Sequence, residues 1–196
     1  MNMIVSPTLT VEEFEKLPDH RGYELIDGYL REKARGAESS EIQSDAHYWI
    51  SRWAKQTRLG KVYGAECMYR CFPSHPDGVR KPDVSFVRRD RLPEGRSPIG
   101  VFTLRPDFVA EVVSPGDTIC DLDEKLADYR DAKIPLVWVL HPNRRTVQVR
   151  TPDRIVGEFD TTAELTADPV LPGFRVRVAD LFPPPIEPAS AESSGS

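Results

Sequence analysis

The chain has 196 residues, of which 29% are charged and 39% hydrophobic, a composition typical of a soluble globular protein. Its formal net charge of −5 argues against nucleic-acid binding through overall charge, but it is compatible with a local basic groove. No apolar run approaches the roughly 20 residues of a membrane span. The N-terminus has neither a basic region nor an apolar signal core. We therefore expect a cytoplasmic protein with no membrane partner.

The cysteines give no sign of a disulfide framework. Cys67, Cys71 and Cys120 are odd in number and have no framework spacing. Buried, reduced thiols are the expected state, in agreement with a reducing compartment.

The first predicted elements are a short helix and a hairpin. Thr10 and Glu13 have the spacing of a capping box at the start of the helix. Residues 22–26 and 29–32 flank an Asp-Gly pair at 27–28, which is a strong signal for a two-residue hairpin turn.

A long helix is predicted over about residues 39–58. Its apolar positions recur at three- and four-residue steps, at Ile42, Ala46, Trp49, Ile50 and Trp53. We expect Gly60 to end the helix as a left-handed cap. His47 lies on this helix, and nothing else with metal-ligand spacing accompanies it, so we interpret it as a packed or surface residue.

Two strands and a long loop follow the helix. Residues 61–72 alternate in a strand pattern, and residues 84–87 form a short strand with Asp83 at its start. The segment 88–105 is charged and rich in proline and glycine. Because a loop of about 18 residues is long for a compact domain, it indicates a functional lid or rim.

The most informative stretch is the apolar run at 107–113, which indicates a strand buried on both faces. Glu111 lies in the middle of this run. Because an unpaired buried carboxylate costs several kcal/mol of desolvation, Glu111 needs a cation, a metal ion or a hydrogen-bond network as its partner.

The rest of the chain completes a mixed sheet. A helix at about 121–132 carries Lys125. Four more strands are predicted, at residues 135–140, 146–150, 155–159 and 174–178. Buried and alternating strands in one chain predict an α/β (α+β) fold with two main helices covering the sheet. We expect one domain over 1–182 and a disordered Pro/Ser-rich tail over 183–196.

Two acids on these strands are candidates for chemistry. Asp83 and Glu111 lie on consecutive strands, which are usually neighbours. Two carboxylates that meet at one end of a sheet repel each other unless a cation lies between them. Mg²⁺ or Mn²⁺ would suit that place, with the backbone carbonyl of Val113 as a further ligand. Lys125 would act as a point charge toward a phosphate or an attacking water.

A structural explanation competes with this one. Glu111 could simply form an ion pair with Lys125 or Lys81, and Asp83 could cap a turn. Composition and spacing do not decide between the two explanations.

A set of motifs in order resembles a known family. They are YELIDG (23–28), KPDVSFV (81–87), DFVAEVVSP (107–115), DL..KL..Y (121–129) and PLVWVLHP (135–142). Together they resemble the Uma2 family, also known as DUF820, over about residues 8–182. Its members are similar to restriction-endonuclease-like PD-(D/E)xK nucleases. The resemblance implies a restriction-endonuclease-like core with an N-terminal hairpin, and a divalent-metal-dependent endonuclease with DNA as the expected substrate.

The resemblance also implies roles for single residues. Asp83 matches the acid of the PD dipeptide, and Glu111 matches the second acid, so both are expected to bind metal. Val113 stands where the superfamily has a lysine, and Lys125 matches the lysine that this family has on the following helix. Glu24 matches the glutamate of YELIDG and is expected to be a further ligand or supporting acid.

Three points remain open at this stage. For Tyr129, which matches a family tyrosine, we favour a packing or hydrogen-bonding role. The segment ESSEIQSD at the start of the long helix has no histidine, where we would look for one in this family. A catalytically inactive nucleic-acid-binding or assembly module, or a self-associating structural protein, is the alternative to an enzyme. A homodimer is expected if both strands of a duplex are cut.

Overall fold

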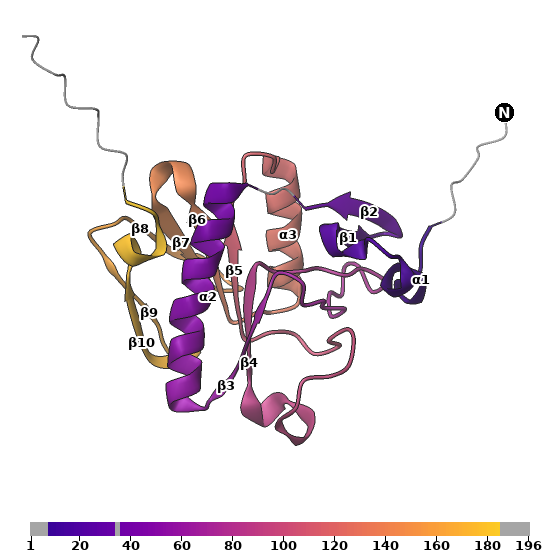
Figure 1. Cartoon of the computed structure of the whole chain (residues 1–196), viewed down its shortest axis with the longest axis horizontal. Coiled ribbons are helices and arrows are strands. Elements are labelled where there is room, and N and C mark those ends of the chain that lie inside the picture. Colours follow the sequence, from indigo (N-terminus) through magenta and orange to yellow (C-terminus); the bar gives the residue numbers. More distant parts are fainter. Residues whose placement is uncertain (1–7, 34–35, 185–196) are drawn as a thin grey trace, which may run out of the picture.

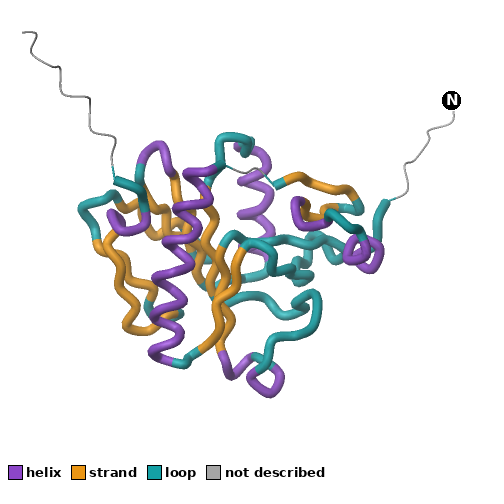
Figure 2. The backbone as a smooth tube through the Cα atoms, viewed as in Figure 1, coloured by secondary structure: helices purple, strands orange, loops and turns teal. Residues whose placement is uncertain are grey.

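The centre of the fold is a six-stranded mixed sheet, and Figure 2 draws its strands in orange together with those of two smaller sheets. The structure is a computed structural model and describes residues 8–33 and 36–184. The strands in spatial order are β3 (Gly60–Gly64), β4 (Val84–Arg88), β5 (Phe108–Val112), β6 (Leu136–His141), β7 (Thr146–Arg150) and β8 (Ile155–Phe159). Within the described residues, β5 and β6 form the one parallel pair in this sheet. The predicted mixed sheet is confirmed.

The two main helices cover opposite faces of this sheet. Helix α2 (Ala37–Thr57) crosses one face (Figure 1), and α3 (Ile119–Asp131) connects β5 to β6 along the other. Side chains alternate along β5: Phe108 packs into the cluster with α2, and Val109 into the cluster with α3. Glu111 therefore faces α3, two residues beyond Val109 on the same side of the strand.

The N-terminal elements form as predicted. Helix α1 (Val11–Lys16) begins with a capping box: the Glu13 amide donates to Thr10 Oγ1 at 3.2 Å, and the Thr10 amide donates to Glu13 Oε2 at 2.9 Å. Strands β1 (Tyr23–Ile26) and β2 (Tyr29–Glu32) pair antiparallel around Asp27 and Gly28. Both turn residues have positive φ, 50° and 80°, as such a turn requires.

The predicted cap at Gly60 is wrong. Arg58, with φ 58°, is the left-handed residue, and its amide donates to Ala54 O at 2.9 Å. Gly60 instead begins β3, where a Cβ atom would lie 2.3 Å from the carbonyl oxygen of Val87 and 2.4 Å from the Phe86 ring. Glycine stands there because the next strand is too close for a side chain.

The strand predicted over 61–72 is also wrong beyond Gly64. The Cys67 amide donates to the carbonyl oxygen of Gly64 at 3.0 Å, so the chain turns there. Tyr69 then forms single bridges to Arg80 and Phe102 instead of joining a strand. The alternating pattern arose from burial against two separate loops.

One strand was not predicted. Strand β9 (Glu164–Ala167) pairs antiparallel with β10 (Leu171–Arg177), and their apolar side chains pack on the α2 side of the main sheet. Five short 3-10 helices complete the described elements: η1 (His20–Gly22), η2 (Arg89–Arg91), η3 (Pro93–Gly95), η4 (Pro142–Arg144) and η5 (Val178–Leu181).

Two expectations concern the rest of the chain. Most of the predicted disordered tail, residues 185–196, lies outside the described residues, as do residues 1–7 of the N-terminus. In the part of the chain that the structure describes, no helix has the length and apolar character needed to cross a bilayer.

Candidate active site

A cavity of about 210 Å³ opens between β2, the start of β4, the end of β5 and α3. It contains the side chains of all four predicted catalytic residues, Glu24, Asp83, Glu111 and Lys125. No residue of the loop 88–105 lines it. That loop leaves β4 at Arg88, the end opposite Asp83, so it does not form the lid or rim of this cavity.

The strand register brings Asp83 and Glu111 together. Val84 pairs with Ala110 in the antiparallel β4–β5 ladder, so one step further places Asp83 opposite Glu111 on the same face. The carboxylate of Asp83 also crosses to β5, because its Oδ2 atom accepts a hydrogen bond from the amide of Val112 at 2.9 Å. Both acids therefore lie at one end of the sheet, as predicted.

Helix α3 supplies the partners of Glu111. Lys125 and Tyr129 are four residues apart and share the helix face that packs on the sheet. The Lys125 ammonium donates to Glu111 Oε2 at 3.3 Å, and the Tyr129 hydroxyl donates to Glu111 Oε1. The hydrogen-bonding role of Tyr129 is thereby confirmed. The structural explanation is half right: Glu111 pairs with Lys125, but the Asp83 carboxylate accepts from the Val112 amide of β5 and from Lys33 and does not cap a turn.

Glu24 reaches the cavity through an added strand contact. Leu25 in β1 and Val79 exchange backbone hydrogen bonds of 3.0 and 2.7 Å, which brings the hairpin next to the segment that leads into β4. The Lys81 amide then donates to Glu24 Oε1 at 2.7 Å. Lys125 lies 3.7 Å from the same carboxylate, so it bridges two buried acids.

Arg80, a residue without a predicted role, organises the deep side of the site. Its guanidinium is buried and contacts Asp128 at 2.7 Å, Glu24 at 3.1 Å and Glu124 at 3.1 Å. A basic residue two positions before the Pro-Asp dipeptide was the available signal. Its partners lie 44 to 56 residues away, and no local pattern indicates them.

Lys33 is a second residue without a predicted role. Its ammonium donates to Asp83 Oδ1 at 3.1 Å and to the carbonyl oxygen of Lys81 at 2.6 Å. It lies just after β2, so the hairpin brings a cation to Asp83 as α3 brings one to Glu111. All four carboxylate oxygens of Asp83 and Glu111 thus have a protein partner.

Val113, predicted to offer its backbone carbonyl to a metal ion, does not line the cavity, whereas its neighbour Val112 does. The Val113 amide donates to Leu140 O at 2.9 Å, toward β6. Val112 directs its amide to Asp83 and lines the cavity.

The charges in the cavity shift the pKa values of its residues in opposite directions. Burial raises the pKa of Glu111 to about 7, assisted by the nearby Asp83 carboxylate and opposed by Lys125. Burial also acts to raise the pKa of Glu24, but Lys125 and Arg80 hold it below its ordinary value. Burial acts to lower the pKa of Lys125, yet Glu111 and Glu24 raise it above its ordinary value. Lys125 is therefore protonated at neutral pH and cannot serve as a general base.

The donor set suits a hard cation with few protein ligands. Among the described residues, no group of three or more His, Cys, Asp or Glu side chains is arranged to hold a metal ion. Two carboxylates and the Val112 carbonyl remain as oxygen donors. Mg²⁺ commonly takes one or two carboxylates and fills its other positions with water and substrate oxygens.

The start of α2 contributes a serine where the sequence lacks a histidine. Ser39 lies there, and it accepts a hydrogen bond from the hydroxyl of Ser114 at 2.9 Å. Ser39, Lys33 and Asp83 line a neighbouring cavity. His47 lies elsewhere on the helix, partly buried beside Ser51, as a packed residue.

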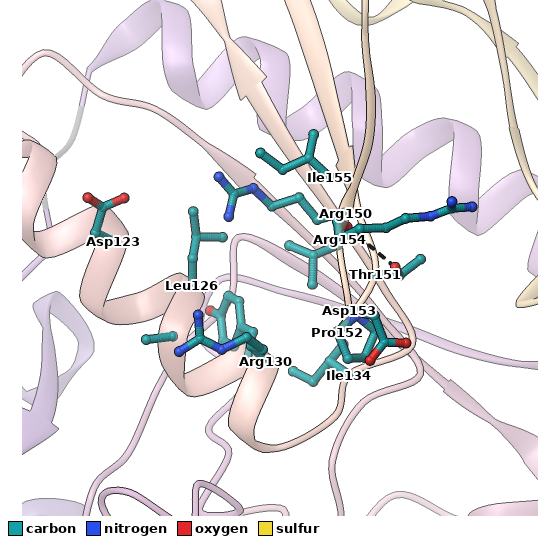
Figure 3. Close-up of a pocket in the computed structure, with 13 residues that line it drawn as sticks. Asp123, Leu126, Arg130, Ile134, Arg150, Thr151, Pro152, Asp153, Arg154 and Ile155 are labelled. Carbon is teal, nitrogen blue, oxygen red and sulfur yellow. Dashed lines mark hydrogen bonds between the residues drawn. The ribbon is translucent and has the colours of Figure 1, made fainter.

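Another cavity, of about 320 Å³, lies between α3 and the turn that joins β7 to β8 (Figure 3). Its charged residues are Asp123 and Arg130 from α3 and Arg150, Asp153 and Arg154 from the other side. None of the four predicted catalytic residues lines it. We therefore place the candidate active site in the cavity of Asp83 and Glu111.

Comparisons with known proteins identify the family of the chain and support its fold. The sequence model of the Uma2 family, described as "Putative restriction endonuclease", matches residues 11–179. Among solved structures, the chain is similar to a crystal structure from Anabaena variabilis of "a putative nuclease belonging to DUF820". That match has a TM-score of 0.75 at 23% identity and covers 89% of this chain and 97% of the other. At this identity the similarity shows the fold alone. No curated protein matches the chain.

Proposed function

The chain belongs to the Uma2 family, and from this premise we propose that it is a divalent-metal-dependent endonuclease that hydrolyses phosphodiester bonds of DNA. The observation that supports the proposal is the meeting of Asp83, Glu111 and Lys125 in one cavity. These residues come from two strands and a helix, and they carry the acid pair and the cation that such a reaction requires.

The charge balance of the cavity supports a role for a metal ion. Lys33 and Lys125 neutralise only part of the charge of Glu24, Asp83 and Glu111, and Arg80 is shared with Asp128 and Glu124. A phosphate group brought into this acidic cavity would be repelled. A bound Mg²⁺ or Mn²⁺ would supply Lewis-acid stabilisation of the phosphate and a more acidic water. Asp83, Glu111 and the Val112 carbonyl would hold it.

In this proposal each charged or polar residue around the acid pair has a defined role. Lys125 keeps its proton and donates hydrogen bonds to the attacking water or to a phosphate oxygen. Tyr129 holds one oxygen of Glu111, which fixes the direction of that carboxylate. Lys33 donates to Asp83 Oδ1, an oxygen that a metal ion bound by Asp83 would also use. Glu24 positions the Lys125 ammonium, and Arg80 in turn holds the Glu24 carboxylate.

The test is cleavage of plasmid DNA, labelled duplex DNA and labelled RNA with Mg²⁺, with Mn²⁺ and with EDTA. We expect cleavage of DNA that requires a divalent ion and is lost in Asp83→Asn, Glu111→Gln and Lys125→Met. Asp153→Asn, an exposed acid in the cavity of Figure 3, is the matched control. Activity that persists in the Asp83 and Glu111 variants would reject the assignment.

A second candidate function is a nucleic-acid-binding or assembly module that has lost catalysis. It is favoured by one observation: every carboxylate oxygen of Asp83 and Glu111 already has a protein partner, so the acids form a closed ion network. Calorimetric titration with Mn²⁺ separates the two candidates. Binding that disappears in Asp83→Asn supports the enzyme, and no binding at millimolar concentration supports the module.

A further inference from the structure

A larger cavity, of about 670 Å³, lies at the other end of β4. Three segments far apart in the sequence form its walls. Arg58 and Leu59 follow α2, Arg88 and Arg89 lie at the end of β4, and the turn 169–172 joins β9 to β10. Figure 1 shows these three segments at the bottom of the view, whereas β2 and α3, which border the active site, lie in its upper half. We call this cavity the arginine cleft.

Backbone contacts hold two of the arginines on one rim. The left-handed conformation of Arg58 ends α2 and turns the chain toward β3. The amide of Arg89 then donates to the carbonyl oxygen of Leu59 at 2.8 Å. Arg58 and Arg89 are thus fixed at neighbouring places of the fold, although 30 residues separate them in the sequence.

Of the three arginines that line the cleft, one has an acidic partner and the other two have none among the described residues. Arg88 pairs with Asp90 at 2.6 Å. Within residues 8–33 and 36–184, the guanidinium groups of Arg58 and Arg89 form neither an ion pair nor a hydrogen bond. Asp90 and Glu94 also line the cleft, so its lining carries three arginines and two acids. In a chain with a net charge of −5, this is a local concentration of positive charge.

The floor of the cleft differs from an ordinary solvated basic face. Leu59 is 44% exposed, Pro169 and Pro172 are exposed, and Val170 is partly buried between them. Apolar surface beside unpaired guanidinium groups suits a ligand that is anionic on one side and apolar on the other. A nucleotide has this chemistry, because its phosphate is charged and its base and sugar present apolar faces.

We infer that the arginine cleft is an exosite for an unpaired segment of the nucleic-acid substrate. Arg58 and Arg89 bind consecutive phosphates, and Leu59 and Val170 contact the intervening nucleotide. The identity of the ligand rests on the proposed nuclease function. The five residues of β4 span about 17 Å, so the exosite and the active site would hold different parts of one strand.

The experiment measures binding in EDTA, where cleavage does not interfere. The anisotropy of a fluorescein-labelled single-stranded oligonucleotide, and of the duplex of the same sequence, is recorded at several salt concentrations. Arg58→Ala/Arg89→Ala is compared with Arg130→Ala/Arg154→Ala, which removes two exposed arginines from the cavity of Figure 3. We expect about tenfold weaker single-strand binding in the first variant. The slope of log K against the logarithm of the salt concentration should become less steep by about 1.4, or about 0.7 for each lost phosphate contact.

Leu59→Glu tests the cleft without removing an arginine, since this side chain is exposed and lies outside the core clusters. It should weaken single-strand binding more than duplex binding. Equal weakening by both arginine pairs, no change in the first pair, or binding of the duplex alone would overturn the exosite. If the wild type does not cleave but binds through Arg58 and Arg89, the exosite stands and the nuclease proposal fails. If cleavage depends on Asp83 but binding does not change in the cleft variants, the nuclease proposal stands and the exosite fails.

Discussion

The two ends of strand β4 differ in charge, although only five residues separate them. At the start of the strand, acids outnumber cations in the lining of the active-site cavity. The acids are Glu24, Glu32, Asp83, Glu111, Asp117, Asp121 and Glu124, and the cations are Arg31, Lys33, Arg80 and Lys125. At the end of the strand, Arg58, Arg88 and Arg89 outnumber Asp90 and Glu94 in the arginine cleft.

For a polyanionic substrate, this difference assigns cleavage to the acidic end of β4 and binding to the basic end. An acidic cavity repels phosphate until a divalent cation neutralises it, whereas a basic cleft attracts phosphate without help. Binding and chemistry would then depend on different residues and different ions. The following predictions test whether the two regions are independent.

The largest expected effect is on cleavage. Asp83→Asn should reduce the cleavage rate at least a thousandfold, or about 4 kcal/mol of transition-state stabilisation, because the metal loses a charged ligand. Single-strand binding in EDTA should stay within about twofold of the wild type, since Asp83 lies outside the cleft. Cleavage assays and anisotropy on the same preparation measure both. A parallel loss of binding would show that the two regions are not independent.

The next effect is on stability. Arg80→Ala should lower the free energy of unfolding by about 3–5 kcal/mol, because the buried carboxylates of Glu24 and Asp128 lose their shared cation. Arg88→Ala, which breaks an exposed pair with Asp90, should leave the free energy of unfolding nearly unchanged. Urea denaturation of both variants at neutral pH measures the contrast. Similar values would mean that the Arg80 network contributes no more than a surface pair.

A smaller effect is expected at Lys33. Lys33→Met should tighten Mn²⁺ binding by about tenfold, because the ammonium that competes for Asp83 Oδ1 is removed. Lys33→Arg keeps the charge and should bind Mn²⁺ about as the wild type does. Isothermal titration calorimetry gives both affinities. Weaker binding in Lys33→Met would instead make Lys33 a support of the metal site.

The last prediction concerns the reactivity of the thiols, which lie outside both regions. Burial raises the pKa of Cys67 to about 11 and that of Cys71 to about 12, so both are almost wholly protonated at pH 8. The thiolate is the reactive form, so the alkylation rate of Cys67 should rise about tenfold per pH unit up to its pKa. At pH 8, iodoacetamide should modify the exposed Cys120 first. Mass spectrometry after short exposure checks the order, and Cys120→Ser should remove the fast phase.

Prediction of the fold from sequence succeeded where the signal was local. The capping box at Thr10, the Asp-Gly turn and the apolar run at 107–113 each depend on neighbouring residues. The errors came from distant contacts. Gly60 stands where it does because Phe86 and Val87 approach it, and Tyr69 is buried through single bridges to Arg80 and Phe102 and not within a strand.

The same distinction separates the parts of the active site. The sequence by itself determined that Glu111, an acid within an apolar strand, requires a partner, and its motifs indicated Asp83, Lys125 and Glu24. Only the tertiary structure decided that the hairpin adds Lys33, that Arg80 joins Glu24 to Asp128, and that Val112 rather than Val113 faces the site. The physical reason is that charged groups select partners by distance in space, and strand register and helix packing set those distances over tens of residues.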